Sequence, residues 1–391
     1  MPSPAVRAAR FALLLSAIVL LPLTASAGTK VFEDGDTYIE AGARIQIQYN
    51  RAESGGEATD EIMFRRIRPY LAGSLTRNWY GKVEFDFGKA SDADEVALKD
   101  AYFAYTGFNR EGYARTIGNA KAPFGREFLT SSKKLQRAEI ALVGDHNYGT
   151  LDRVLGLHLA GSESEGRFGW GISAGSESHD PSSDRMDFDT PVNGQSDWNE
   201  GWAASARVEV FPMGPMKYDQ GDLKHSDPKV SLALAGYIWA NDDDRNTYTD
   251  SDGESENATK ADLDQATGLE ASAGFRGKGL SADAELHRVH GETVVQDFTG
   301  GLYQNGETNL TLFSGSAGYM LVQKRLEAVV GYDILDASNY ASTWTTLYVG
   351  ANVFLDGHNL KFQGGYSLGR NANGVTDQDL NQVTLLAAYV F

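Results

Sequence analysis

The stretch of sequence that decides the fold comes last: DLNQVTLLAAYVF, residues 379–391. Every second residue of its last nine is apolar, and the opposite face carries Gln382 and Thr384, with Leu386 and Val390 as apolar exceptions. An alternation of period two predicts a β-strand with one apolar face and one wet face. Two interpretations fit this pattern: the last strand of a soluble β-domain, or the last strand of a transmembrane barrel.

The other end of the chain favours the membrane interpretation. Arg7 and Arg10 precede the 13-residue run Phe11 to Leu23, and Ala25-Ser26-Ala27 follows it. A basic start, a short apolar run and a small-x-small site predict a signal peptide, residues 1–27, that is cleaved before Gly28. The alternative of an uncleaved anchor is disfavoured because a membrane-spanning helix needs roughly 20 apolar residues.

Composition restricts the fold class of the remaining residues, 28–391. The chain has no cysteine, so neither disulfides nor thiolate metal sites stabilise it, and 43 glycines and 18 tyrosines against 10 prolines favour an all-β fold. No second long apolar run predicts a membrane-spanning helix. A closed barrel satisfies every backbone hydrogen bond in a membrane without continuous apolar sequence. We therefore predict a transmembrane antiparallel β-barrel over residues 28–391.

The alternation recurs in sixteen segments of about the length of a tilted membrane strand, roughly 9–11 residues. They are residues 38–49, 62–75, 79–88, 97–107, 112–121, 153–161, 167–175, 201–211, 229–240, 266–276, 280–289, 310–322, 325–335, 343–355, 360–369 and 379–391. An even strand number places both ends in the periplasm. The terminal Phe391, two residues after Tyr389, resembles the signal that the barrel assembly machinery reads, which makes that machinery an expected partner.

The connections between these segments alternate in length, as expected for short periplasmic turns and long external loops. The long polar loops are residues 50–61, 122–152, 176–200, 241–265 and 290–309. Residues 212–228 break the rule, because they should form a short turn and do not. Either the register slips there or the barrel carries a periplasmic extension. The acidic loop 241–264 lacks the spacing of a helix-loop-helix calcium site, and we expect it to be solvated near outer-membrane lipid and lipopolysaccharide.

Aromatic side chains near strand ends or on apolar faces predict the girdles that amphipathic rings form at lipid headgroups. These are Tyr49, Tyr70, Trp79, Phe103, Tyr105, Trp170, Trp202, Trp239, Tyr348, Phe362, Tyr366 and Tyr389.

Two basic stretches stand out in a chain of net charge −18, which becomes −20 when Arg7 and Arg10 are lost. In the first, alternation turns Arg66 and Arg68 toward the lumen, and Lys82 follows on the next segment. Arg65 falls on the wrong face unless the strand is bulged there or its head snorkels to the interface.

The second basic stretch runs from Arg110 to Arg137, mostly within the third long loop. Its basic residues are Arg110, Arg115, Lys121, Arg126, Lys133, Lys134 and Arg137. If the loop folds inward, these charges create a positive potential in a narrow throat; otherwise they are loop-surface charges. We take Arg65, Arg66, Arg68, Lys82, Lys121, Lys133, Lys134 and Arg137 as the predicted anion path.

The same stretches carry a family resemblance. The residues concerned are Phe64-Arg65-Arg66, Gly73, Trp79, Val83 to Phe87, Leu98 to Phe103, Gly118, Lys121 to Gly125, Leu129 to Lys133, Arg153 to Leu157 and Phe391. In this order and spacing they resemble the phosphate-selective porin O/P family, most densely from Ile39 to Gly161.

This resemblance implies a sixteen-stranded homotrimeric pore in the Gram-negative outer membrane, with the third loop folded inward and selectivity for phosphate or related small oxyanions. Arg65 and Arg66 match the family's arginine pair, and Lys133 matches a lysine of the inward loop. The family's ladder of later arginines has candidates here in Arg207, Arg276, Arg288 and Arg325, mixed with acidic residues. No cofactor and no metal site are implied.

Two other functions remain open from the sequence. The −20 charge suits a general or cation-preferring porin on the same scaffold. A barrel enzyme would need a nucleophile beside a general base, and His158 with a serine is the best pair the chain offers, without a supporting spacing. His287 and His290 should lie on opposite faces of a strand, which argues against a metal pair.

Overall fold

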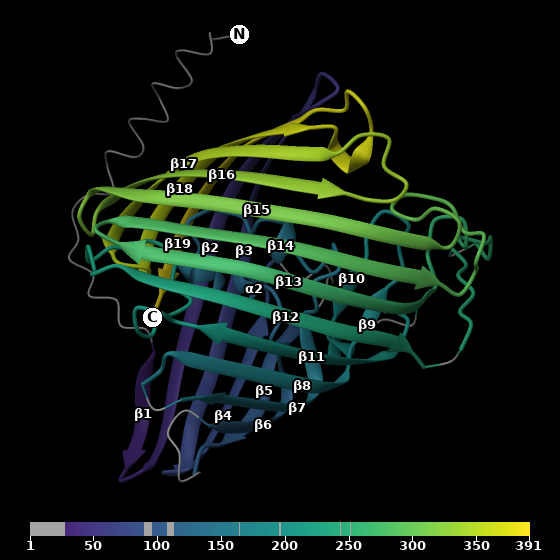
Figure 1. Cartoon of the computed structure of the whole chain (residues 1–391). Helices are drawn as coiled ribbons and strands as arrows, with labels where there is room; N and C mark the ends of the chain where they lie inside the picture. Colours follow the sequence, from purple (N-terminus) through teal and green to yellow (C-terminus); the bar gives the residue numbers. More distant parts are fainter. Residues whose placement is uncertain are drawn as a thin grey trace.

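The computed structural model describes residues 28–89, 96–107, 113–163, 165–194, 197–242, 244–250 and 252–391. Over this part of the chain, each barrel strand pairs antiparallel with its neighbour in sequence, and the last strand, β19, pairs with β2 to close the barrel (Figure 1). Within the described ranges, no helix is long and apolar enough to cross a membrane. The predicted signal peptide lies outside the described residues.

Sixteen strands form the barrel wall, one for each predicted segment. They are β2 (Thr37–Ser54), β3 (Glu57–Thr76), β4 (Trp79–Asp86), β5 (Ala97–Tyr105), β6 (Ala114–Lys121), β7 (Arg153–Ser162), β8 (Phe168–Ser176), β11 (Gly201–Val210), β12 (Lys229–Asn241), β13 (Leu263–Gly277), β14 (Leu280–Thr293), β15 (Glu307–Val322), β16 (Leu326–Asp336), β17 (Trp344–Asp356), β18 (Leu360–Arg370) and β19 (Leu380–Val390). The prediction of a sixteen-stranded antiparallel barrel is confirmed. Its reason is the alternation of exposed apolar and buried polar residues along most strands.

The prediction of a first long loop at residues 50–61 is wrong. β2 continues to Ser54, β3 begins at Glu57, and Gly55 and Gly56 make the turn with positive φ. The hairpin is mostly exposed, so both of its faces are wet and no apolar alternation marks it in the sequence. Only backbone pairing between β2 and β3 extends this hairpin beyond the apolar band of the barrel.

A strand that the sequence pattern did not predict, β1 (Thr29–Asp34), lies outside the barrel wall. It pairs with the start of β2, beyond the point where β19 ends, with Thr29 opposite Ala41. Every residue of β1 is exposed, which explains why it carries no periodic apolar signal.

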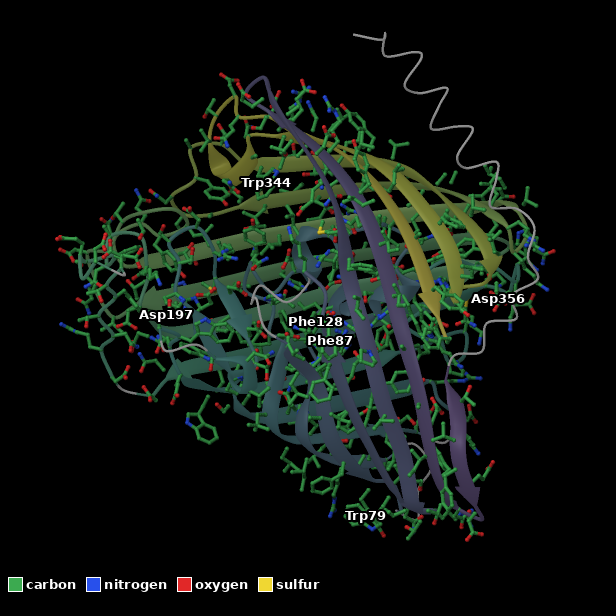
Figure 2. The ribbon with its side chains drawn as sticks, turned by 180° about the vertical axis from the view of Figure 1, so that it is seen from behind. Trp79, Phe87, Phe128, Asp197, Trp344 and Asp356 are labelled. Atoms are coloured by element: carbon green, nitrogen blue, oxygen red, sulfur yellow. The ribbon has the colours of Figure 1, made fainter. Side chains whose placement is uncertain are left out.

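The lumen is largely filled by the chain's own connections. The third long loop, residues 122–152 and called here the inward loop, contains α2 (Arg126–Leu129) and two 3-10 turns, Ser132–Lys134 and Leu142–Gly144. Figure 1 shows α2 inside the barrel, and Figure 2, from behind, shows Phe128 of this helix within the outline of the wall. The predicted inward fold of the third loop is therefore confirmed.

A second insertion comes from the loop between β8 and β11, which forms the hairpin β9 (Ser178–Asp180) and β10 (Asp187–Asp189) and a 3-10 turn, Pro191–Asn193. Phe188 of this hairpin packs against Trp239, with ring centroids 5.6 Å apart. Trp239 and Tyr348 are buried, so their assignment to the lipid girdle was wrong. A loop packed inside the barrel gives inward-facing aromatic residues an apolar partner, which strand periodicity does not reveal.

The same packing explains the apolar exceptions of the last strand. Leu386 and Ala388 of β19 are buried together with Ala138 of the inward loop. Phe391, on the other face, is exposed as predicted. A last 3-10 turn, Ala372–Gly374, precedes this strand.

Candidate functional site

Between the inward loop and the wall made by β2 to β7 lies a cleft of about 310 Å³, called here the basic cleft. Among the described residues, eight basic side chains line it against four carboxylates. The basic residues are Arg44, Arg65, Arg66, Arg68, Lys82, Lys99, Lys121 and Arg153, and the acidic ones are Glu84, Asp100, Asp145 and Asp152. This part of an acidic chain therefore carries a local excess of positive charge.

Arg65 reaches this cleft because β3 is bulged. The register of β2 and β3 shifts here: Gln46 pairs with Arg66, whereas Ile47 pairs with Phe64. Arg65 is the extra residue, and its Nε donates a 3.0 Å hydrogen bond to Glu139 of the inward loop. A bulge can turn two consecutive side chains toward one face, which is how both arginines of the pair enter the lumen.

Several cations of the cleft are held by carboxylates on neighbouring strands. Arg68 donates to Asp86 at 2.6 Å, and Lys82 donates to Asp100 at 2.6 Å. Arg153, at the start of β7, also donates to Asp100, at 2.8 Å. These pairs fix the positions of the basic groups while neutralising part of their charge.

Four other cations in or beside the cleft have no carboxylate of the described residues within ion-pair distance. They are Arg66, Lys99, Lys121 and Lys133. Arg66 is 7% exposed and donates to the neutral side chain of Gln46 at 3.0 Å, and Lys121 donates to the backbone oxygen of Phe128. Burial, followed by the nearby Arg44 and Lys134, lowers the pKa of Lys133. Cations without paired carboxylates can accept a mobile anion.

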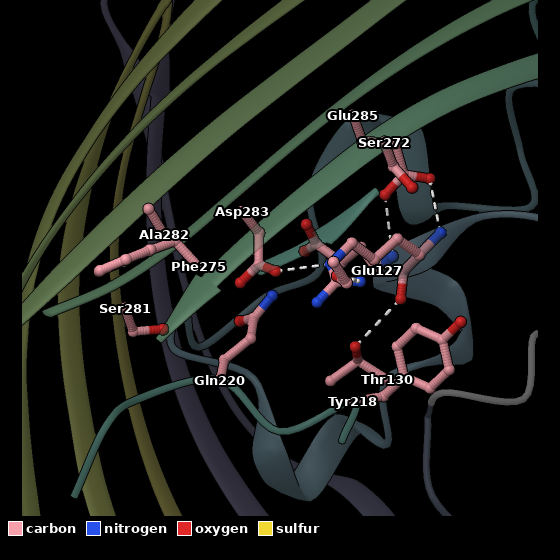
Figure 3. Close-up of polar contacts among 12 residues, drawn as sticks. Glu127, Thr130, Tyr218, Gln220, Ser272, Phe275, Ser281, Ala282, Asp283 and Glu285 are labelled. Carbon is pink, nitrogen blue, oxygen red and sulfur yellow. Dashed lines mark hydrogen bonds and ion pairs between the residues drawn. The ribbon is translucent and has the colours of Figure 1, made fainter. Parts of the chain in front are cut away.

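The inward loop is anchored to the opposite wall by acidic side chains of β13 and β14 (Figure 3). Glu285 accepts hydrogen bonds from the backbone N–H of Arg126 and of Glu127, at 2.8 and 2.9 Å. Glu270 accepts from the N–H of Gly125 at 2.7 Å. The guanidinium of Arg126 donates to Asp283 at 2.6 Å.

Two residues of the predicted anion path lie away from the cleft. Arg137 is buried against β16 and donates to both carboxylate oxygens of Asp333, at 2.7 and 2.6 Å. Lys134 forms an ion pair with Asp219, from the connection between β11 and β12. Both cations come from the predicted loop, but local tertiary contacts direct them to acids outside the cleft. Arg110 of the same basic stretch lies outside the described residues.

The predicted ladder of later arginines does not form. Arg207 and Arg276 face inward, but carboxylates of Glu270 and Asp283 neutralise them at 2.6 and 2.7 Å. Arg288 is exposed on the outer side of β14, and Arg325 is exposed in a turn. The half of the lumen lined by β11 to β16 is thus neutralised, whereas the half lined by β2 to β7 is basic.

Arg44, Lys99 and Arg153 line the cleft but were not among the predicted path residues. Arg44 donates to Ser132 of the inward loop at 2.7 Å, and its alternation with outward apolar residues on β2 already turned it inward. Lys99 is 4% exposed on β5. Strand phase could have identified these side chains, because it applies to acidic and basic residues alike.

One group of side chains has the composition of a cation site. The ligand atoms of Glu270, Glu285 and His287 lie within 4.8 Å of one another, and all three residues are buried. The carboxylates already accept the amides that hold the inward loop, and His287 contacts Glu285 at 2.6 Å. This arrangement serves as the anchor of the loop. His290 lies on the outer face of the same strand, as predicted.

Comparison with known proteins agrees with this architecture. Residues 39–205 match the family model of phosphate-selective porin O and P. No curated protein matches the chain.

Solved structures share the fold at low sequence identity. An outer membrane protein of Vibrio cholerae, OmpT in its trimer form, is 13% identical with a TM-score of 0.57, over 94% of this chain and 100% of that one. The outer membrane channel DcaP of Acinetobacter baumannii is 14% identical with a TM-score of 0.57, over 94% and 100%. An anion-selective porin from Comamonas acidovorans is 11% identical with a TM-score of 0.55, over 91% and 100%.

The matched region contains the bulged arginine pair, all of the lining of the basic cleft and the inward loop. Residues 39–205 thus match the phosphate-selective porin O and P family model over less than half of the chain, and the sixteen-stranded barrel is the fold of the outer-membrane proteins compared above.

Proposed function

We propose that the barrel is a passive outer-membrane channel in which small oxyanions such as phosphate pass through the basic cleft. The observation that supports this most directly is the set of cations without paired carboxylates among the described residues in or beside the basic cleft, Arg66, Lys99, Lys121 and Lys133. Arg65, Arg68 and Lys82 complete the path as cations held by carboxylates. The match of residues 39–205 to the phosphate-selective porin O and P family model supports the same preference for anions.

The size of the effect follows from the low dielectric of a narrow throat. Two unit charges 4 Å apart interact by roughly 4 kcal/mol at an effective dielectric constant of 20, against roughly 1 kcal/mol in bulk water. About 1.4 kcal/mol of residual preference already gives tenfold selectivity. One uncompensated cation can therefore control the sign of selectivity in spite of a chain charge of −18.

Lys133 provides the test, because it is only partly buried and has no ion pair in the described residues. We expect Lys133→Glu to shift the reversal potential in a salt gradient toward cations and to abolish the block of chloride current by phosphate, with Lys133→Gln intermediate. Planar-bilayer recording measures both. Lys324→Glu, in an exposed turn, is the matched control and should change little, because exposed charges are screened within about 8 Å at physiological salt.

The runner-up is a general or cation-preferring porin, favoured by the acidic net charge. Cation selectivity of the wild-type channel, or equal effects of the Lys133 and Lys324 variants, would replace the anion proposal with this one. For the enzyme alternative, the described part of the chain offers His158 backbone partners in Val154, at 3.0 Å, and Gly118, but no serine hydroxyl.

The cellular setting completes the proposal. We infer that a signal peptide of residues 1–27 is removed before Gly28 and that the barrel assembly machinery recognises Phe391. In the outer membrane the barrel would then contact lipid and lipopolysaccharide and assemble as a homotrimer. Support for the trimer comes from the Vibrio cholerae protein of the same fold, which is described in a trimer form.

A further inference from the structure

The connection between β11 and β12, residues 211–228 and called here the inward turn, departs from the short turns at the same end of the barrel. Its neighbour between β13 and β14 contains only Lys278 and Gly279. Instead of crossing the rim, the inward turn folds into the lumen, where Gln220 is 3% exposed. Neither the family match nor the described anion path accounts for this segment.

The inward turn is fixed to the wall at its base. Asp222 accepts a 2.8 Å hydrogen bond from the backbone N–H of Gly279, and the N–H of Gly221 donates to Ser281 at 2.9 Å. Arg276 of β13 donates to the backbone oxygen of Asp219 at 2.7 Å. The segment is therefore held by several independent contacts to β13 and β14.

Tyr218 fills the space between the inward turn and the inward loop (Figure 3). Its ring lies under the guanidinium groups of Arg126 and Arg207, with the centroid 5.3 and 5.8 Å away. The hydroxyl donates to Glu209 and accepts from Arg207 at 3.1 Å. One aromatic side chain thus joins β11 to the helix of the inward loop.

The inward turn and the inward loop then meet directly. The N–H of Gln220 donates to the backbone oxygen of Lys134 at 3.1 Å, and the N–H of Gln136 donates to Oε1 of Gln220 at 2.7 Å. Asp219 forms an ion pair with Lys134. A segment from the periplasmic end and a loop from the external end thereby close one side of the lumen together.

We propose that the inward turn is a second constriction element, which closes the half of the lumen lined by β11 to β16 and positions the inward loop so that solutes pass only through the basic cleft. This inference rests on the proposed channel function. In the closed half, Glu270 and Asp283 neutralise Arg207 and Arg276, so an open path there would lack the excess of positive charge that lines the basic cleft. By binding Lys134, Asp219 also fixes the backbone next to Lys133.

Two variants test the proposal. In the first, residues 213–226 are replaced by a short Asn-Gly turn; in the second, Tyr218→Ala, Asp219→Asn and Gln220→Ala remove the side-chain contacts at unchanged length. We expect single-channel conductance to rise, by roughly twofold if the second half becomes as wide as the first. Anion-to-cation permeability should fall at the same time, because the new path is neutralised by ion pairs and lacks the excess of cations of the basic cleft. If the shortened chain does not fold, the triple variant still tests the proposal, because it keeps the length of the turn.

The matched control exchanges two exposed residues of the same turn, Lys217→Ala and Lys224→Ala, and should leave both conductance and selectivity unchanged. Unchanged conductance in the triple variant, or an equal change in the control, would overturn the inference. A wild-type channel that prefers cations would instead overturn the proposed function, while a conductance increase in the triple variant would still support the constriction. The two failures are therefore distinguishable.

Discussion

At the scale of single residues, Glu127 couples the inward loop to pH. Burial outweighs the neighbouring Arg137 and raises the pKa of Glu127 to about 8, while its Oε1 accepts a 2.7 Å hydrogen bond from the N–H of Ala141. A raised carboxyl pKa gives a stabilising contribution that is complete below pH 4.5 and is lost as the pH rises through 8. We expect current fluctuations to increase between pH 7 and 9, since an ionised Glu127 repels Asp333 and Glu285. Glu127→Gln should remove this dependence in bilayer recordings, and a dependence that persists in the variant would contradict the assignment.

At the scale of elements, the inward loop depends on its anchor in β14. Glu285→Ala leaves the N–H groups of Arg126 and Glu127 without acceptors, at a cost of about 1–3 kcal/mol for each buried donor. We expect the barrel to assemble but the loop to become sensitive to limited proteolysis, with larger fluctuations of the single-channel current. Glu292→Ala, at the exposed end of the same strand, is the control and should resemble the wild type. Equal protease resistance of all three proteins would show that the loop is held elsewhere.

At the scale of the whole molecule, closure of the barrel depends on the pairing of β19 with β2. The N–H of Phe391 donates to Ala43 at 3.0 Å and its oxygen accepts from Ala43 at 2.8 Å, so Phe391 completes the seam. We expect deletion of Phe391 to leave the chain in the periplasm, degraded or aggregated, because these bonds and the terminal aromatic are lost together. Fractionation and heat-modifiable migration on gels measure the outcome, and Phe391→Tyr should assemble normally. Normal insertion of the truncated chain would show that the terminal residue is not required.

Part of the candidate site was predictable from strand phase. The inward positions of Arg66, Arg68 and Lys82 follow from alternation with lipid-facing apolar residues, and the structure places all three in the cleft. An inward Arg65 could be predicted only on the condition that the strand is bulged. A bulge is a local change of register, which the alternation of apolar and polar residues does not reveal. The ion-pair partners of Lys134 and Arg137 could not be predicted from the sequence, since they are acidic residues 85 and 196 positions away.

The sequence by itself determined the barrel and its sixteen strands, and its resemblance to a known family implied that the third loop folds inward. It could do so because a strand between lipid and water must alternate, and because backbone groups in a membrane must pair with neighbouring strands. Only the tertiary structure decided which cations remain without carboxylate partners and which half of the lumen is closed. Charge pairing acts over a few ångströms between segments far apart in the chain, so Asp219 with Lys134 and Asp333 with Arg137 become partners only when the connections fold into the lumen.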